Sequence, residues 1–128
     1  MILGIGIDII DIRRIEKTIN KYGYRFINKC FLQTEISKYD RRRNRIQSYA
    51  KSYAAKEACA KALGTGLARG VYWKDIEVSN NNLGKPIITL HNKAAKILNQ
   101  ISYKNTRIEV SLSDEKNYAI SNVIIFNE

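Results

Sequence analysis

The sequence predicts an α+β domain in which an antiparallel sheet packs against one long helix. Three observations support this prediction: an apolar, strand-like segment at the start, segments of helical periodicity after it, and two pairs of strand-like segments separated by one further helix. The expected order is β-α-α-α-β-β-α-β-β. A chain of 128 residues without internal repeats or a linker is expected to form a single domain over residues 1–128.

The first strand is expected over residues 2–10, as a buried strand. Period-two alternation places Leu3 and the isoleucines at positions 5, 7 and 9 on one face, and it places Gly4, Gly6 and Asp8 on the other. A glycine inside a strand often marks the close approach of another group. We therefore expect open space beside the Asp8 carboxylate.

Helical periodicity follows this strand. Asp11 is expected to cap the first helix, and a short second helix is expected near residues 26–31. Thr34 can cap a further short piece. The long helix is expected from about residue 45 to residue 63, where Gly64 supplies a terminator.

The second half of the chain predicts four strands and one helix. Strands are expected over residues 75–79 and 86–90, joined by the turn-rich NNNLGK, and a helical stripe follows over residues 94–101. The last two strands are expected over residues 106–112 and 118–126. The turn SDEKN between them predicts an antiparallel hairpin.

The charge balance of the chain is strongly basic. Lys and Arg number 22 against 12 Asp and Glu, which gives a net charge of +10. Such an excess favours an anionic partner, which could be a nucleic acid, a phosphorylated ligand, an acidic protein or a membrane surface. A surface that only keeps the protein soluble would explain the charge equally well.

Cysteine usage and the N-terminal segment predict a cytoplasmic protein. Cys30 and Cys59 lie in apolar helical patterns outside any C-x-x-C motif, so we expect buried free thiols in a reducing compartment. The apolar start lacks a basic leader and carries two aspartates, which makes it a poor signal peptide. No segment approaches a transmembrane span, and no membrane partner is expected.

The long helix carries its charges on one side. Tyr53, Glu57 and Lys61 share a face at helical spacing, Gly64 completes the column, and small residues occupy the opposite side. Glu57 and Lys61 could form an ordinary surface ion pair worth about 0.2–0.5 kcal/mol. The Gly-Thr-Gly at the helix end could be a simple C-cap, or its backbone N–H groups could approach an anion.

Asp8 and Glu57 are the candidate metal ligands. Two carboxylates from different elements, with Lys61 nearby, suit Mg²⁺ bound to a diphosphate, because magnesium takes one or two protein carboxylates plus phosphate oxygens. The alternative for Asp8 is the capping of a turn or helix. His91 is the only histidine, which argues against a zinc cluster or a Ser-His-Asp triad, and GIGID lacks the third glycine of a dinucleotide-binding fingerprint.

Four motifs, in order, carry a family resemblance. They are GIGIDIIDIRRIEK at residues 4–17, AAKEACAKALGTG at 54–66, KDIEVSNNNLGKP at 74–86 and SLSDEKNYAISNVII at 111–125. Together they resemble the holo-acyl-carrier-protein synthases, the small bacterial type of 4′-phosphopantetheinyl transferase. The resemblance spans nearly the whole chain and implies the fold of that family. It also implies transfer of the phosphopantetheine arm of coenzyme A to a serine of apo-acyl carrier protein, in support of fatty acid biosynthesis, with adenosine 3′,5′-bisphosphate as the second product.

The resemblance assigns roles to single residues. Asp8 in the G-x-D strand and Glu57 in the K-E-A helix match the family's Mg²⁺ ligands, and Lys61 matches its phosphate-contacting lysine. These three are the implied catalytic residues. The general base is left open between Glu57 and a metal-bound water.

The resemblance also implies binding surfaces. Besides Lys61, the residues implied in coenzyme A binding are Gly64, Thr65, Gly66, Gly84, Lys85 and Pro86. Arg14 matches a position that contacts the carrier protein, and Arg25 is a second candidate. Members of the family are usually trimers with active sites between subunits, so a homotrimer is implied.

Two positions depart from the family pattern. Asp114 stands where the family usually has His, which replaces an imidazole that could contact a phosphate with an anion. Ser52 stands where Arg is frequent, and Lys51 or an arginine from residues 41–45 could supply the missing charge. We expect a lower affinity for coenzyme A than is typical of the family.

The rival interpretation is a small basic nucleic-acid-binding module. Its support is the net charge of +10 and the run DRRRNR at residues 40–45. The expected strands lack the stacked-aromatic pattern of an RNA-recognition motif, so nucleic acid is not the expected partner.

Overall fold

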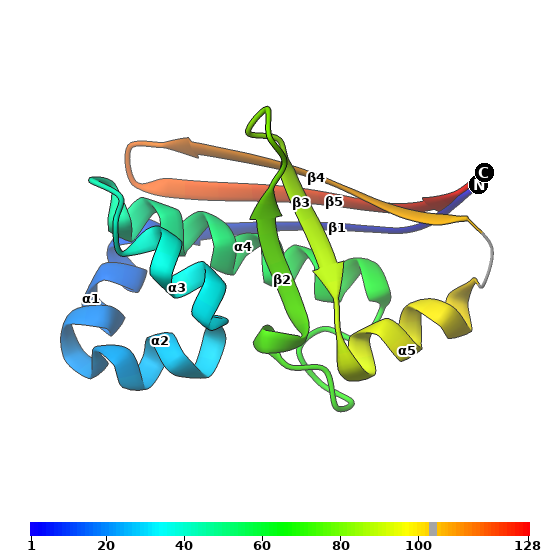
Figure 1. The fold of residues 1–128 in the computed structure, drawn as a ribbon, viewed down its shortest axis with the longest axis horizontal. Helices are drawn as coiled ribbons and strands as arrows, with labels where there is room; N and C mark the ends of the chain where they lie inside the picture. Colours follow the sequence, from blue (N-terminus) through cyan, green and yellow to red (C-terminus); the bar gives the residue numbers. More distant parts are fainter. Residues whose placement is uncertain (103–104) are drawn as a thin grey trace.

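The computed structural model describes residues 1–102 and 105–128, and its elements follow the predicted order with one addition (Figure 1). The elements are β1 (Ile2–Asp11), α1 (Ile12–Tyr22), α2 (Tyr24–Cys30), α3 (Gln33–Tyr39), α4 (Arg45–Leu63), the 3₁₀ turn η1 (Trp73–Asp75), β2 (Ile76–Asn80), β3 (Pro86–Leu90), α5 (Asn92–Ile101), β4 (Thr106–Glu115) and β5 (Tyr118–Asn127). The short piece expected before the long helix is the complete helix α3. Four helices, rather than three, therefore separate the first two strands.

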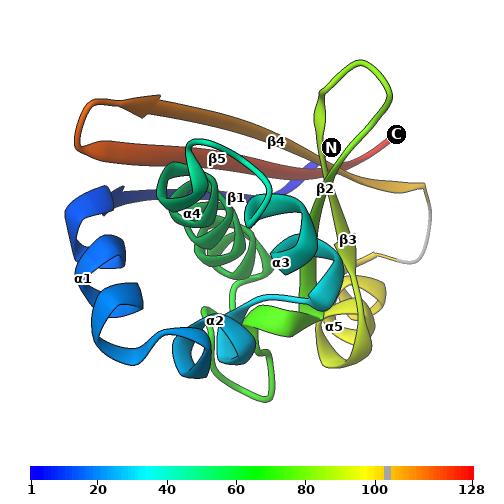
Figure 2. The same ribbon diagram turned by 60° about the vertical axis from the view of Figure 1, so that its left-hand side comes forward.

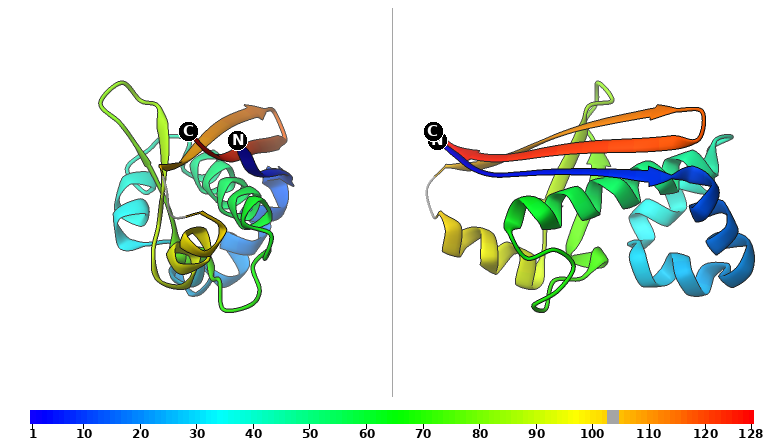
Figure 3. Two further views of the ribbon diagram at one scale, coloured as in Figure 1. Left: turned by 90° about the vertical axis from the view of Figure 1, so that its right-hand side faces the viewer. Right: turned by 180° about the vertical axis from the view of Figure 1, so that it is seen from behind.

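The strands form two antiparallel sheets. One has three strands in the order β1-β5-β4, and the other is the separate hairpin β2–β3. The expected antiparallel pairing is confirmed, but the sequence did not predict that the first strand pairs with the last. This pairing brings the two ends of the chain together, where the Met1 ammonium donates to the Asn127 carbonyl oxygen at 2.8 Å (Figure 3).

The long helix α4 lies against one face of the three-stranded sheet, as expected. In Figure 2 it is seen nearly end-on beneath β1 and β5, with α1, α2 and α3 grouped around its N-terminal half. One cluster of buried side chains joins the C-terminal half of α4 to both sheets and α5. A second cluster joins its N-terminal half to α1, α2 and α3, so α4 is the element that connects the two cores.

The burial of β1 differs from the prediction. Ile5, Ile7 and Ile9 are 60%, 56% and 63% exposed, whereas Gly6 and Asp8 are buried. The face that packs against α4 is therefore the glycine face. Leu3 departs from the alternation and packs into the core, next to a register irregularity between Ile2 and Gly4.

The two strand glycines allow this contact. A Cβ atom on Gly4 would lie 2.0 Å from the Ala62 carbonyl oxygen, and one on Gly6 would lie 1.8 Å from the Ala58 carbonyl oxygen. The space left by the two missing side chains is thus occupied by the backbone of α4, whereas Asp8 itself lines an open cavity, as expected. Alanine suits the other side of the contact, because it combines the highest helix propensity with a small side chain.

Two of the expected helix caps are confirmed and one is wrong. The Asp11 carboxylate accepts the Arg13 N–H at 2.9 Å and caps α1, and Gly64 ends α4 in the left-handed conformation with φ of 85°. Thr34 does not cap α3. The helix begins two residues earlier than Thr34 would require, after Leu32, whose N–H donates to the Glu35 carboxylate at 2.8 Å.

Both cysteines are buried free thiols, as expected. Burial raises the pKa of the Cys30 thiol to about 11 and that of the Cys59 thiol to about 12. Within residues 1–102 and 105–128, no helix combines the length and the apolar character needed to cross a membrane.

Gly6→Ala is expected to lower the free energy of unfolding by more than about 3 kcal/mol, because the added methyl group meets a backbone carbonyl that cannot rotate away. Urea titration followed by circular dichroism measures the effect. Gly64→Ala is the control: its Cβ meets nothing within 4 Å, and only the strain of the left-handed conformation at φ of 85° remains, about 1–2 kcal/mol. Equal losses for the two variants would contradict the steric explanation.

Candidate active site

The contact between β1 and α4 brings two carboxyl groups together. Asp8 lies on the glycine face of β1, two residues after Gly6, and its side chain is 10% exposed. Glu57 lies on α4, one residue before Ala58, the residue that packs on Gly6. The two side chains are close enough to share a hydrogen bond when one of them is protonated, and they line the same cavity. The predicted convergence of Asp8 and Glu57 is therefore present in the geometry.

The environment of Glu57 disfavours its charged form. Burial raises the pKa of this carboxyl group, and the negative charge of Asp8 raises it further. The Tyr53 hydroxyl and the Lys61 ammonium act in the opposite direction but do not cancel the effect. Two close carboxylates with an unfavourable mutual repulsion form a site that a cation would stabilise.

Lys61 bridges the helix and the strand. Its ammonium donates to Asp8 Oδ1 at 2.9 Å and to the Ile7 carbonyl oxygen at 3.0 Å, while the side chain stays 53% exposed. The ion pair of Lys61 is thus with Asp8 across the β1–α4 contact, rather than with Glu57 along the helix. Because half of the side chain reaches solvent, its ammonium is accessible to a ligand at the mouth of the site.

A cavity of about 280 Å³ opens beside the two carboxyl groups. Its lining residues are Asp8, Ile9, Ile10, Arg14, Ile15, Thr18, Phe26, Tyr53 and Glu57. Arg14 from α1 therefore faces the same space as Asp8 and Glu57. Arg25 is exposed on α2 and does not line this cavity.

The two glycine-containing tracts lie apart from this cavity. Gly64 and Thr65 follow Lys61 and line a neighbouring hollow of about 300 Å³ together with Arg69 and Lys93. The turn of Gly84, Lys85 and Pro86 joins β2 to β3 and projects beyond β4 (Figure 1). An ion pair between the Lys85 ammonium and the Glu109 carboxylate at 2.8 Å fixes this turn to β4. Within one chain, the structure does not bring this turn to Asp8.

The two departures from the family pattern lie near each other. Asp114 forms an ion pair with Lys51 at 3.3 Å, so part of the charge of Lys51 is already neutralised. Ser52 is 2% exposed and lines a small hollow of about 80 Å³ with Arg42 and Lys51. The structure thus places two cations beside the position where the family often has Arg.

The donor set at Asp8 and Glu57 fits a hard divalent cation. Over the described residues, no cluster of three or more His, Cys, Asp or Glu side chains could hold a metal ion. A site with two carboxylates fits magnesium, which keeps several waters and completes its octahedral shell with phosphate oxygens of a substrate. It fits zinc poorly, because structural and catalytic zinc sites use at least three protein ligands.

Sequence reasoning missed one buried charged residue of α4. Lys56, directly before Glu57, is fully buried and forms an ion pair with Glu35 of α3 at 2.8 Å. The helical pattern gave only a weak signal, a lysine on a side otherwise made of small residues. Its partner lies 21 residues earlier in the chain, beyond the reach of any local pattern.

Comparison with known proteins places the chain in a family. A model of the 4′-phosphopantetheinyl transferase superfamily matches residues 4–123, so the chain belongs to this superfamily. More narrowly, the chain is 48% identical over 128 residues to the holo-[acyl-carrier-protein] synthase of Sinorhizobium fredii, with 100% of this chain and 92% of that protein covered. The resemblance that the four motifs indicated is confirmed.

Crystal structures confirm the fold. The holo-[acyl-carrier-protein] synthase of Neisseria meningitidis matches with a TM-score of 0.88 at 31% identity, covering 99% of this chain and all of that one. The synthase of Helicobacter pylori in complex with coenzyme A matches with a TM-score of 0.82 at 31% identity, covering 95% of this chain and 99% of that one.

Glu57→Gln is expected to raise the melting temperature of the metal-free protein near about pH 8. The folded state binds the Glu57 proton more tightly than the unfolded state does, so ionisation of Glu57 opposes folding above the ordinary pKa of 4.5. The gain should be largest above the raised pKa and should shrink as the pH falls towards 4.5. Melting curves in EDTA across this pH range measure it. Glu16→Gln, on the exposed side of α1, is the control, and a Glu57→Gln gain that does not vary with pH would contradict the raised pKa.

Proposed function

We propose that this protein is a Mg²⁺-dependent holo-[acyl-carrier-protein] synthase. It transfers the 4′-phosphopantetheine group of coenzyme A to a serine of apo-acyl carrier protein and releases adenosine 3′,5′-bisphosphate. The observation that carries the proposal is the pairing of Asp8 and Glu57 beside Lys61, in a chain of this superfamily. The names of its relatives and the coenzyme A bound to the Helicobacter pylori synthase support the choice of substrates.

The reaction requires charge to be neutralised on a diphosphate. The serine hydroxyl oxygen bonds to the phosphorus that carries the pantetheine, and the bond from that phosphorus to the bridging oxygen breaks. Asp8 and Glu57 would hold Mg²⁺, which supplies positive charge next to the phosphoryl group and the leaving phosphate. Lys61 supplies a second positive charge, since its half-exposed ammonium can turn from Asp8 to a phosphate oxygen.

The serine proton needs an acceptor, and Glu57 is suited to this role. Glu57 lines the cavity that Arg14 also lines, where a carrier serine held by Arg14 would be within its reach. A metal-bound water is the alternative acceptor.

The first helix offers the carrier protein a basic surface. Arg13, Arg14 and Lys17 are exposed on α1, and Arg14 reaches the cavity itself. We propose Arg14 as the contact closest to the reacting serine, with Arg25 on α2 as a second contact. An acidic carrier fits this surface by charge complementarity.

We also propose a homotrimer with active sites between subunits. The outer face of the β1–β5 pair exposes Ile5, Ile7, Ile9 and Ile120, and contiguous exposed apolar side chains of this kind mark an interface. The turn of Gly84, Lys85 and Pro86 does not reach Asp8 within one chain, so it would bind coenzyme A at the site of a neighbouring subunit. The buried free thiols are consistent with a cytoplasmic location.

A mass-shift assay tests the proposed function. The wild type, mixed with Mg²⁺, coenzyme A and apo-acyl carrier protein, is expected to add one phosphopantetheine group to the carrier, and excess EDTA is expected to prevent the addition. Glu57→Gln should lower kcat by about 100-fold or more, because it removes a metal ligand and a base, while Glu16→Gln should retain full activity. The absence of an adduct with wild-type protein would exclude the function, and an unchanged kcat in Glu57→Gln would exclude the assigned role of Glu57.

Sedimentation velocity tests the oligomer. The wild type is expected to sediment as a trimer, and Ile5→Glu is expected to sediment as a monomer, because it places charges on the proposed interface. Ile87→Glu is the control, since this isoleucine is 37% exposed on the other sheet. A monomeric wild type, or a trimeric Ile5→Glu variant, would contradict the proposed interface.

A further inference from the structure

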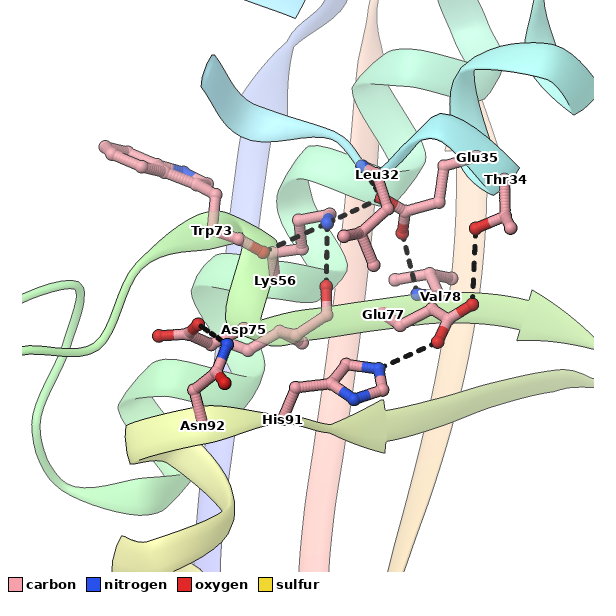
Figure 4. A network of polar contacts seen from close by, with 11 residues as sticks. Leu32, Thr34, Glu35, Lys56, Trp73, Asp75, Glu77, Val78, His91 and Asn92 are labelled. Carbon is pink, nitrogen blue, oxygen red and sulfur yellow. Dashed lines mark hydrogen bonds and ion pairs between the residues drawn. The ribbon is translucent and has the colours of Figure 1, made fainter. Parts of the chain in front are cut away.

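The ammonium of Lys56 has every hydrogen engaged inside the protein. It donates to Glu35 Oε1 at 2.8 Å, to the Ile76 carbonyl oxygen at 2.7 Å and to the Trp73 carbonyl oxygen at 3.0 Å (Figure 4). The residue has no exposed surface. An ammonium group has three donors, so Lys56 has none left for a substrate.

The Glu35 carboxylate accepts hydrogen bonds at both of its oxygens. Besides Lys56, it accepts the Leu32 N–H at Oε1 and the Val78 N–H at Oε2, both at 2.8 Å. The Lys56–Glu35 pair therefore joins three parts of the chain: the start of α3, the helix α4, and the segment from η1 into β2. Closer to the surface, the Glu77 carboxylate of β2 accepts the Thr34 hydroxyl at 3.3 Å and pairs with His91 at 2.8 Å (Figure 4). These bonds are a second connection between α3 and the β2–β3 hairpin.

Stability alone gives little reason for a buried ion pair. Removing two charges from water costs about as much as their attraction returns, and apolar residues of similar size are often equally stabilising. Such a pair is, however, directional: it holds only where donors and acceptors meet. The pair can therefore fix the rotation of α4 about its own axis.

The contact of α4 with β1 is made by the carbonyl groups of Ala62 and Ala58 against Gly4 and Gly6, with the half-exposed side chain of Lys61 as a polar link to the strand. A half-exposed hydrogen-bonding group resists a rotation of α4 about its own axis less than the fully buried bonds of Lys56 do. A rotation of about 20° would move a side-chain atom at the helix surface by roughly 2 Å. A shift of that size would break the three bonds of Lys56, and it would carry Glu57, the next residue, away from Asp8.

We propose that Lys56 is a positioning residue that fixes the rotation of α4 and thereby directs Glu57 towards Asp8. Lys56 acts through Glu57 and touches neither metal nor substrate. This inference rests on the proposed function, because it concerns the orientation of the proposed metal ligand. The expected loss of rate without Lys56 follows from how strongly catalysis depends on the position of Glu57, since a displacement of about 1 Å can lower a rate about 100-fold.

Lys56→Met tests the proposal against a stability-matched control. Met matches the unbranched apolar stem of Lys, lacks only the terminal ammonium, and removes its charge and hydrogen bonds. Ile76→Ala is the control, because it removes a fully buried side chain from β2 but keeps the backbone carbonyl to which Lys56 donates. Both variants are expected to melt at lower temperature than wild type, and all assays are run where circular dichroism shows them folded.

The readouts are the kinetics of carrier modification and the dissociation constant of Mn²⁺ in the absence of substrates. Lys56→Met is expected to lower kcat about tenfold or more and to weaken Mn²⁺ binding about fivefold or more, with the KM for coenzyme A changed less than about threefold. Ile76→Ala is expected to keep all three quantities within about threefold of wild type. Equal kcat and Mn²⁺ affinity in the two variants would show that Lys56 is only structural and would overturn the proposal.

A second variant covers the case in which Lys56→Met does not fold. Glu35→Gln leaves Lys56 with its two carbonyl acceptors and should lower kcat and Mn²⁺ affinity in the same direction by a smaller factor; unchanged values would overturn the proposal. A wild type that binds Mn²⁺ but modifies no carrier would refute the proposed function alone, and the Mn²⁺ affinities of the variants would then decide on Lys56. A wild type that binds no Mn²⁺ would overturn the positioning role as well.

Discussion

The close contact between α4 and the glycine face of β1 is the constraint on which the rest of the structure depends. Because Gly4 and Gly6 carry no side chains, the carbonyl groups of Ala62 and Ala58 approach the strand to distances that any Cβ would prevent. Asp8 follows these glycines, and Glu57 and Lys61 flank the alanines. A packing requirement and the placement of three polar side chains are therefore met by the same few positions.

Buried charge is used in two opposite ways on adjacent residues of α4. Lys56 and Glu35 are bonded to each other and to backbone groups, and all three donors of the Lys56 ammonium are used within the chain. Glu57 and Asp8 repel each other, with the Tyr53 hydroxyl acting on Glu57 and the Lys61 ammonium bound to Asp8. One site is satisfied within the chain, and the other becomes favourable when a cation is added.

The sequence predicted the order of the strands and the position of each main helix, with bounds up to three residues from those observed, because strand and helix periods are local properties. It also predicted the face shared by Tyr53, Glu57 and Lys61, which follows from helical spacing alone. It could not predict which face of β1 is buried, since alternation divides a strand into two faces without saying which one meets the core. The partner of β1, the Lys56–Glu35 pair and the distance between Asp8 and the turn at Gly84 depend on contacts between remote segments, which local patterns do not encode.

The pairing of β1 with β5 has a consequence for how the protein is made. During translation, β1 leaves the ribosome more than a hundred residues before the strand that holds it in the sheet. The nascent chain must therefore carry its row of isoleucines unpaired while those residues are synthesised. Contacts of such large sequence separation form slowly, and exposed strands of this kind are recognised by chaperones and prone to aggregate. The strand that carries Asp8 is thus synthesised before Glu57 and Lys61 but enters its sheet only after β5 has followed them.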